Sequence, residues 1–143
     1  MRSAILILTL LFAFLVIPAV HAEDALEWYT KGQNAATVGD YATAITYYDR
    51  ALLLDRNYAS AYAGKAAAQN SLGKYEDAIA NAESALALKS MDPVALNARA
   101  LGLFNLKRYE EAAAAYDTLF LVQLYDVGTR ELESFGLKSV ARH

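Results

Sequence analysis

A spacing of 34 residues, repeated along most of this 143-residue chain, limits the folds that the chain can adopt. Identical or similar residues recur at this spacing in several series, which are Tyr41, Tyr75 and Tyr109; Ala44, Ala78 and Ala112; Val38, Leu72 and Leu106; and Gly32, Ala66 and Ala100. The spacing divides the chain into three repeats, at 25–58, 59–92 and 93–126. A unit of this length cannot bury its apolar face alone, so the repeats are predicted to stack into one continuous core.

Each repeat is predicted to contain two helices. Apolar and small residues lie three and four positions apart, as on one face of a helix, in two stretches per repeat. The stretches are separated by Gly39-Asp40, Gly73-Lys74 and Lys107-Arg108. Glycine can take the left-handed conformation that closes a helix, and Lys107 is expected to take it at a cost of roughly 1 kcal/mol. The predicted fold class is therefore all-α.

Helix starts carry signals of their own. The acidic pairs Glu76-Asp77 and Glu110-Glu111 follow two of these breaks, where the positive end of a helix dipole stabilises negative charge. We interpret them as solvated first-turn residues and not as catalytic carboxylates. Asp92-Pro93 opens the third repeat as an N-cap followed by the residue that suits the first helical position.

The recurring residues resemble the tetratricopeptide repeat. Repeat one carries Trp28-x-x-Lys31-Gly32-x-x-Ala35 and then Gly39-x-Tyr41-x-x-Ala44-x-x-x-Tyr48-x-x-Ala51. Repeat two agrees at Tyr62, Ala66, Gly73, Tyr75, Ala78 and Ala85, and repeat three at Leu96, Ala100, Tyr109, Ala112 and Tyr116. The resemblance covers 25–126 and implies an α-solenoid of three helix-turn-helix repeats.

The third repeat departs from the other two on its outer side. Leu119 replaces the alanine found at Ala51 and Ala85, and it opens the apolar stretch Leu119–Leu124. A terminal repeat has to cover such a face. If nothing in the chain covers it, we expect the third repeat to receive another subunit, which makes a homo-oligomer possible.

The segment after the third repeat offers a cover. Leu132, Phe135 and Val140 form an apolar stripe beside charged residues. We therefore expect a C-terminal capping helix at about 128–140 that buries Phe135 against repeat three, although Gly136 weakens that helix by up to about 1 kcal/mol.

The N-terminus has the layout of a secretory signal peptide. Met1-Arg2-Ser3 precedes an apolar run from Ala4 to Val20, and compact residues lie three and one positions before Glu23. We predict cleavage after Ala22, which leaves a tetratricopeptide-repeat domain at 23–143. The alternative is an uncleaved membrane anchor at 1–22, because seventeen apolar residues lie at the lower limit for spanning a bilayer. In either case the repeats are expected outside the cytoplasm, secreted or membrane-anchored.

The residue inventory argues against catalysis. The chain has no cysteine and two histidines, His21 and His143, which both lie outside the repeats. Nucleophilic Ser-His and Cys-His pairs and the usual transition-metal ligands are therefore missing, so we predict no enzyme activity, no cofactor and no metal. Cleavage would remove Arg2 and take the formal net charge from −3 to −4, which disfavours nucleic acid as a partner.

The resemblance also implies where a partner binds, because the first helix of each tetratricopeptide repeat lines the concave side of the superhelix. The row beside the packing residues contains Tyr29, Gln33, Ala36, Ala63, Ala67, Asn70, Asn97, Leu101 and Phe104. Tyr29, Gln33, Asn70, Asn97, Leu101 and Phe104 are the predicted contacts, since amides can bond a peptide backbone and the apolar side chains can hold its side chains. Some relatives grip an acidic peptide terminus with cations in this groove, but the row here has no cation, and that activity is not carried over.

Two further sets of recurring residues have structural interpretations. Lys31, Lys65 and Arg99 form a ladder that could attract an acidic partner, but their stems are expected to lie over apolar surface with their charges in water. The aromatic residues that the spacing assigns to packing between helices are Trp28, Tyr41, Tyr62, Tyr75 and Tyr109.

The predicted function is that of an exported protein–protein interaction module, a scaffold that binds a peptide segment of another protein in the concave groove. The alternative is a structural or self-assembling envelope component, anchored by an uncleaved N-terminal helix. A carrier of a small lipid or glycan would need a deeper pocket than these groove positions suggest.

Overall fold

The computed structural model describes residues 24–134 and places six helices and no strand among them. The helices are α2 (Ala25–Thr37), α3 (Tyr41–Leu54), α4 (Ala59–Ser71), α5 (Tyr75–Leu88), α6 (Pro93–Asn105) and α7 (Tyr109–Ser134). This arrangement confirms the predicted all-α fold class. The predicted signal peptide or anchor at 1–22 lies outside the described residues.

The helix starts are fixed by aspartate caps at three places. The carboxylate of Asp24 accepts the backbone N–H of Glu27 at 2.7 Å, and that of Asp40 accepts the N–H of Thr43 at 3.1 Å. Asp92 caps α6 with Pro93 in the first position, as the sequence predicts. Each cap satisfies N–H groups that have no partner inside the helix.

The turns within the repeats confirm the predicted left-handed positions. Gly39 and Gly73 have φ of 82° and 73°, and Lys107, at the equivalent place in the third repeat, has φ of 62°. A side chain in this conformation crowds the following carbonyl group. The third turn therefore carries a strain that the two glycine turns avoid.

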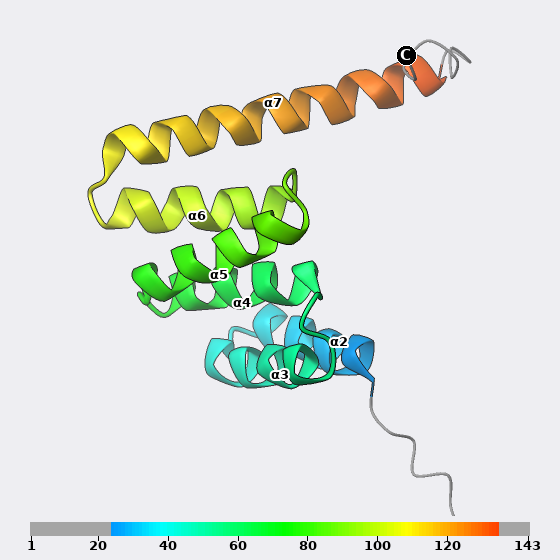
Figure 1. Ribbon diagram of the computed structural model, residues 1–143, viewed down its shortest axis with the longest axis vertical. Helices are drawn as coiled ribbons and strands as arrows, with labels where there is room; N and C mark the ends of the chain where they lie inside the picture. Colours follow the sequence, from blue (N-terminus) through cyan, green and yellow to red (C-terminus); the bar gives the residue numbers. More distant parts are fainter. Residues whose placement is uncertain (1–23, 135–143) are drawn as a thin grey trace, which may run out of the picture.

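The helices stack in chain order, one repeat on the next, with α2 and α3 at one end and α7 at the other (Figure 1). The second helix of each repeat receives the first helix of the next, so α4 packs on α3 and α6 packs on α5. The core therefore runs through the stack and is made mostly of alanine. Such small side chains let helix backbones approach one another closely.

Residue sizes are matched between neighbouring helices. Tyr48 of α3 is 3% exposed and fills the space between Gly32 and Gly64, where an added Cβ would lie 2.6 Å and 2.7 Å from its ring. One repeat later the same three positions are all alanine, and these residues form a single buried cluster of Ala66, Ala82 and Ala98. One layer therefore packs a tyrosine between two glycines, and the equivalent layer of the next repeat is made of three alanines.

Ion pairs join neighbouring repeats on the outside of this core. Lys65 Nζ lies 2.7 Å from Asp49 Oδ1, and Arg99 Nε lies 3.5 Å from Glu83 Oε1. In each pair a base on the first helix of one repeat meets an acid on the second helix of the repeat before. Lys31 Nζ lies 3.2 Å from Glu27 Oε1 of its own helix, so all three members of the basic ladder have acidic partners within the chain.

The first helix of the stack has a different outer face from α4 and α6. Where α4 has Ala61, Gly64 and Ala68, and α6 has Ala95, Ala98 and Gly102, the equivalent residues of α2 are Glu27, Thr30 and Asn34. All three α2 residues are exposed. These polar side chains suit contact with solvent and do not permit the close approach of another helix.

The last helix differs from the prediction. We expected a separate capping helix at about 128–140, but residues 128–134 continue α7, which has 26 residues. No proline interrupts 109–134, and Gly128 alone costs the helix about 1 kcal/mol. Residues 135–140, including Phe135 and its predicted burial, lie outside the described part of the chain.

The continuous helix leaves apolar side chains uncovered. Leu119 packs on the stack and is buried, whereas Phe120, Leu121 and Leu124 are exposed, as α7 runs past the end of α6 (Figure 1). Tyr109 is exposed too, so its predicted place in the core is wrong. None of the helices in residues 24–134 is long and apolar enough to cross a bilayer.

Candidate functional site

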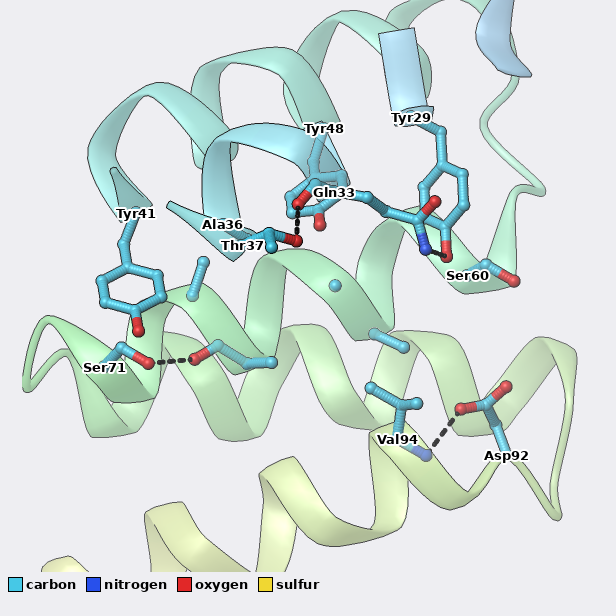
Figure 2. Close-up of a pocket in the computed structure, with 14 residues that line it drawn as sticks. Tyr29, Gln33, Ala36, Thr37, Tyr41, Tyr48, Ser60, Ser71, Asp92 and Val94 are labelled. Carbon is cyan, nitrogen blue, oxygen red and sulfur yellow. Dashed lines mark hydrogen bonds between the residues drawn. The ribbon is translucent and has the colours of Figure 1, made fainter. Parts of the chain in front are cut away.

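A cavity of about 320 Å³ opens between α2 and α4 (Figure 2). Its floor is made of small residues of α4, which are Ala63, Gly64, Ala67 and Ala68. Two predicted contacts, Tyr29 and Gln33, line it together with Ala36 of the same row. The residues of the predicted row that lie on α2 and α4 therefore line one cavity, except for Asn70.

Hydroxyl groups surround the small floor. Thr37 and Tyr41 line one end of the cavity with Ser71, and Ser60 lies near Tyr29 at the other end (Figure 2). Sequence reasoning did not select these residues. Ser60 lies one helical turn before Ala63, and Ser71 lies one turn after Ala67. Extending the row on α4 by one turn at each end would therefore have included both serines.

The tyrosine hydroxyl at this site is held by its neighbours. Gln33 Nε2 donates to Tyr29 Oη at 3.0 Å, and the Tyr29 ring lies 5.0 Å from that of Tyr58 and 5.8 Å from that of Tyr48. Burial, followed by the negative charge of Asp92, raises the pKa of Tyr29 above its usual 10.0. Tyr29 therefore remains a neutral phenol at physiological pH, able to donate or accept a hydrogen bond.

Asp92 is the single charged residue of 24–134 that lines this cavity. Its Oδ1 accepts from the N–H groups of Val94 and Ala95 at 3.0 and 3.1 Å, and its Oδ2 lies 3.0 Å from Lys89 Nζ. The carboxylate is buried and has partners on both oxygens. Asp92 is the N-cap of α6 and lies before the first residue of that helix, so the row of first-helix residues gave no sign of it.

Asn70 does not belong to this groove. Its side chain is buried, and Nδ2 donates to the carbonyl oxygen of Ala98 at 2.7 Å. The Cβ that a side chain would add at Gly102 would lie 3.3 Å from Asn70 Oδ1, so the amide fills the contact between α4 and α6. We expected Asn70 to contact a partner, but this placement makes it a residue of the interior.

The three predicted contacts on α6 lie outside the cavity. Asn97, Leu101 and Phe104 are exposed, and the Phe104 ring meets the edge of Tyr109 at 5.5 Å between centroids. They form a separate exposed row on α6. Across 24–134, no group of His, Cys, Asp or Glu side chains lies in a position to hold a metal ion.

Comparison with known proteins agrees with this architecture. A family model described as anaphase-promoting complex, cyclosome, subunit 3 matches residues 37–119, which is more than half of the chain. No curated protein sequence matches the chain.

Several solved structures are similar. The second tetratricopeptide domain of Spaghetti (RPAP3), bound to the HSP90 peptide SRMEEVD, is 26% identical with a TM-score of 0.67, over 70% of this chain and 93% of that one. The second such domain of human RPAP3, in complex with the HSP70 peptide SGPTIEEVD, is 26% identical with a TM-score of 0.65, over 68% and 82%. The Sgt2 domain from Aspergillus fumigatus is 25% identical with a TM-score of 0.67, over 80% and 78%.

The repeat period, the paired helices and these matches agree with one another. The chain belongs to the tetratricopeptide-repeat family that the model of anaphase-promoting complex subunit 3 describes.

Proposed function

We propose that this protein is an exported interaction module that binds a peptide segment of another protein in the groove between α2 and α4. The observation that carries the proposal is the cavity of about 320 Å³, with hydroxyl and amide groups around a floor of alanine and glycine. Small floor residues admit a peptide backbone, and Gln33 and Ser60 offer it donors and acceptors. The similar domains that hold chaperone peptides support this use of the fold.

The chemistry of the groove favours an uncharged peptide segment. The peptides named for the similar domains end in Glu-Glu-Val-Asp, which carries several negative charges. Among the described residues, no lysine or arginine lines the cavity, and the one acid that does, Asp92, is already paired with Lys89. We therefore infer that affinity rests on burial and amide hydrogen bonds, and that it changes little with salt concentration.

The direct test fills the groove. Ala67→Trp places a large ring on the floor, and Ala80→Trp places the same ring at an exposed position of α5 outside the cavity. A partner captured by the unmodified protein from envelope extract should be lost with Ala67→Trp and kept with Ala80→Trp. Equal capture by the two variants, both folded by circular dichroism, would show that the groove is not the binding site.

Export is the second part of the proposal and rests on the sequence of residues 1–22. Cleavage after Ala22 would leave Asp24 in place as the cap of α2, so the first helix would stay complete. Mass measurement of the protein recovered from the envelope should give a chain that begins at Glu23. Recovery of the intact chain from the membrane would favour the anchored alternative, and recovery from the cytoplasm would contradict export.

Self-assembly is the second candidate function. The exposed apolar residues of α7 favour it, because contiguous apolar surface of this kind commonly marks an interaction site. Sedimentation of the protein over a range of concentrations distinguishes the candidates. A monomer throughout favours the interaction module, and concentration-dependent association favours the structural component.

A further inference from the structure

The outer face of α7, formed by Tyr116, Asp117 and Phe120, is the equivalent of two surfaces that are covered inside the stack, and the exposed Leu124 extends it by one turn. Tyr48 and Ala82 hold the place of Tyr116 in α3 and α5, and they are 3% and 0% exposed because α4 and α6 cover them. Tyr116 itself is 37% exposed. In the described residues, this kind of face is covered twice by the first helix of the next repeat, and the third such face, on α7, is left open.

The two covering helices share a pattern of small residues. α4 presents Ala61, Gly64 and Ala68, and α6 presents Ala95, Ala98 and Gly102 at the same positions. Five of these six residues are buried, and at the sixth, Gly64, an added Cβ would clash with Tyr48 of the helix beneath it. The small side chains let the covering helix approach closely.

The covering helices also share a base. Lys65 of α4 meets Asp49 of α3, and Arg99 of α6 meets Glu83 of α5. Asp117 holds the same position on α7. The open face therefore repeats both halves of the internal contact, the apolar stripe and the acid beside it.

A second copy of the chain does not supply the matching helix at its other end. The equivalent face of α2 carries Glu27, Thr30 and Asn34 in place of the small residues. Glu27 would be brought toward the apolar stripe, where burying its charge is unfavourable. End-to-end stacking of copies is disfavoured for this reason.

We propose that the outer face of α7 binds a helix of a partner protein that carries the pattern small-x-x-small-basic-x-x-small. The three small residues lie over Tyr116, Phe120 and the neighbouring stripe, and the lysine or arginine meets Asp117. This surface is separate from the groove between α2 and α4 and does not depend on the function proposed for that groove.

The probe is a peptide with the sequence of residues 57–73, stapled between positions 62 and 66 so that it is helical in isolation. The spacing places these two positions on the side opposite to Ala61, Gly64 and Ala68. The control peptide is identical except for Ala61→Glu, Gly64→Thr and Ala68→Asn, the residues of α2. Binding to the whole protein is followed by fluorescence anisotropy, and the control is expected to bind at least about tenfold more weakly, because bulky polar groups prevent close packing.

Two adjacent residues provide a matched pair of protein variants. Phe120 and Leu121 are 64% and 63% exposed, and as adjacent residues of a helix with 3.6 residues per turn they lie about 100° apart around the axis of α7. Phe120→Ser should weaken peptide binding several-fold, and Leu121→Ser should leave it unchanged. A charge exchange tests the pairing: Asp117→Lys should weaken binding by about threefold, and a Lys65→Glu peptide should restore it.

Three results would overturn the proposal. Equal binding of the two peptides, or equal loss in the two serine variants, would mean that the contact is unspecific. Loss of peptide binding in Gln33→Ala would place the peptide in the groove. Self-association of the protein that Phe120→Ser abolishes would assign the face to a second copy.

Discussion

At the scale of single residues, Tyr48 shows how side-chain volume is shared between repeats. Its ring occupies the space left by Gly32 and Gly64, and the equivalent layer one repeat later uses three alanines. Gly64→Ala alone should destabilise the protein by about 1–3 kcal/mol, because the new methyl group meets the ring. Urea unfolding measures the change.

The matched control for that prediction rebuilds the second layer. Tyr48→Ala should cost about 3–5 kcal/mol by leaving a cavity. Adding Gly32→Ala and Gly64→Ala to it reproduces the composition of the Ala66–Ala82–Ala98 cluster and should recover part of the loss. A triple variant less stable than Tyr48→Ala would contradict size matching.

The two asparagines predicted to bind a partner are expected to behave differently. Asn70→Ala removes a buried hydrogen bond to the Ala98 carbonyl and should lower the free energy of unfolding by about 1–3 kcal/mol. Asn97→Ala changes an exposed residue and should leave stability within about 0.5 kcal/mol. Urea unfolding of both variants checks this. Equal stability of the two variants would contradict the interior position of Asn70.

Alkaline pH should weaken the fold through the buried tyrosines. Burial raises the pKa of Tyr48 from 10.0 to about 12, and that of Tyr29 is raised as well. The Tyr48 hydroxyl ionises near pH 10 in the unfolded chain but near pH 12 in the folded one, so its contribution to stability is complete below pH 10 and is lost between these values. In Tyr48→Phe the fall should be smaller, as measured by urea unfolding at several pH values.

At the scale of helices, the turn before α7 stores a removable strain. Lys107 has φ of 62°, where the other two repeats have glycine. Lys107→Gly should therefore raise stability by up to about 1 kcal/mol, and the reciprocal Gly73→Lys should lower it by a similar amount. Thermal unfolding of the two variants checks this, and a destabilised Lys107→Gly would mean that the turn carries no strain.

The turns were predictable from sequence, whereas the end of the last helix was not. Gly39, Gly73 and Lys107 lie at a spacing that assigns one conformation to all three, so the unfavourable lysine could be identified in advance. The length of α7 depends on the absence of a stop signal after Val122. The apolar stripe of Leu132, Phe135 and Val140 was interpreted as a separate helix, but 109–134 has no proline, and Gly128 alone is too weak a signal to end a helix.

The candidate site divides in the same way. Tyr29 and Gln33 were found because both lie on one helix row, which a period of 3.6 residues defines. Asp92 was missed because it is the N-cap of α6 and therefore lies outside the row of first-helix residues. Asn70 was wrongly assigned to the groove because it lies at the side of the row that faces the next repeat. Only the packing of α4 against α6 shows that this side is buried.

At the scale of the whole molecule, the two ends of the stack are not equivalent. The face of α2 is polar and that of α7 is apolar with an acid beside it. Replacing 123–143 by a copy of 55–92 should therefore add a stacked repeat and raise the melting temperature, because each interface adds stability. A copy of 25–58 placed before Asp24 should not raise it, and equal gains at both ends would contradict the asymmetry.

Tyr48 also has a consequence for how this protein can change over evolutionary time. Its ring belongs to the interior and at the same time forms part of the wall of the groove. A mutation of Tyr48 that altered partner choice would also destabilise the fold, so this part of the wall is constrained against change. Thr37, Ser60 and Ser71 line the same groove without filling the interior, so new specificities can arise through them while the scaffold is inherited intact.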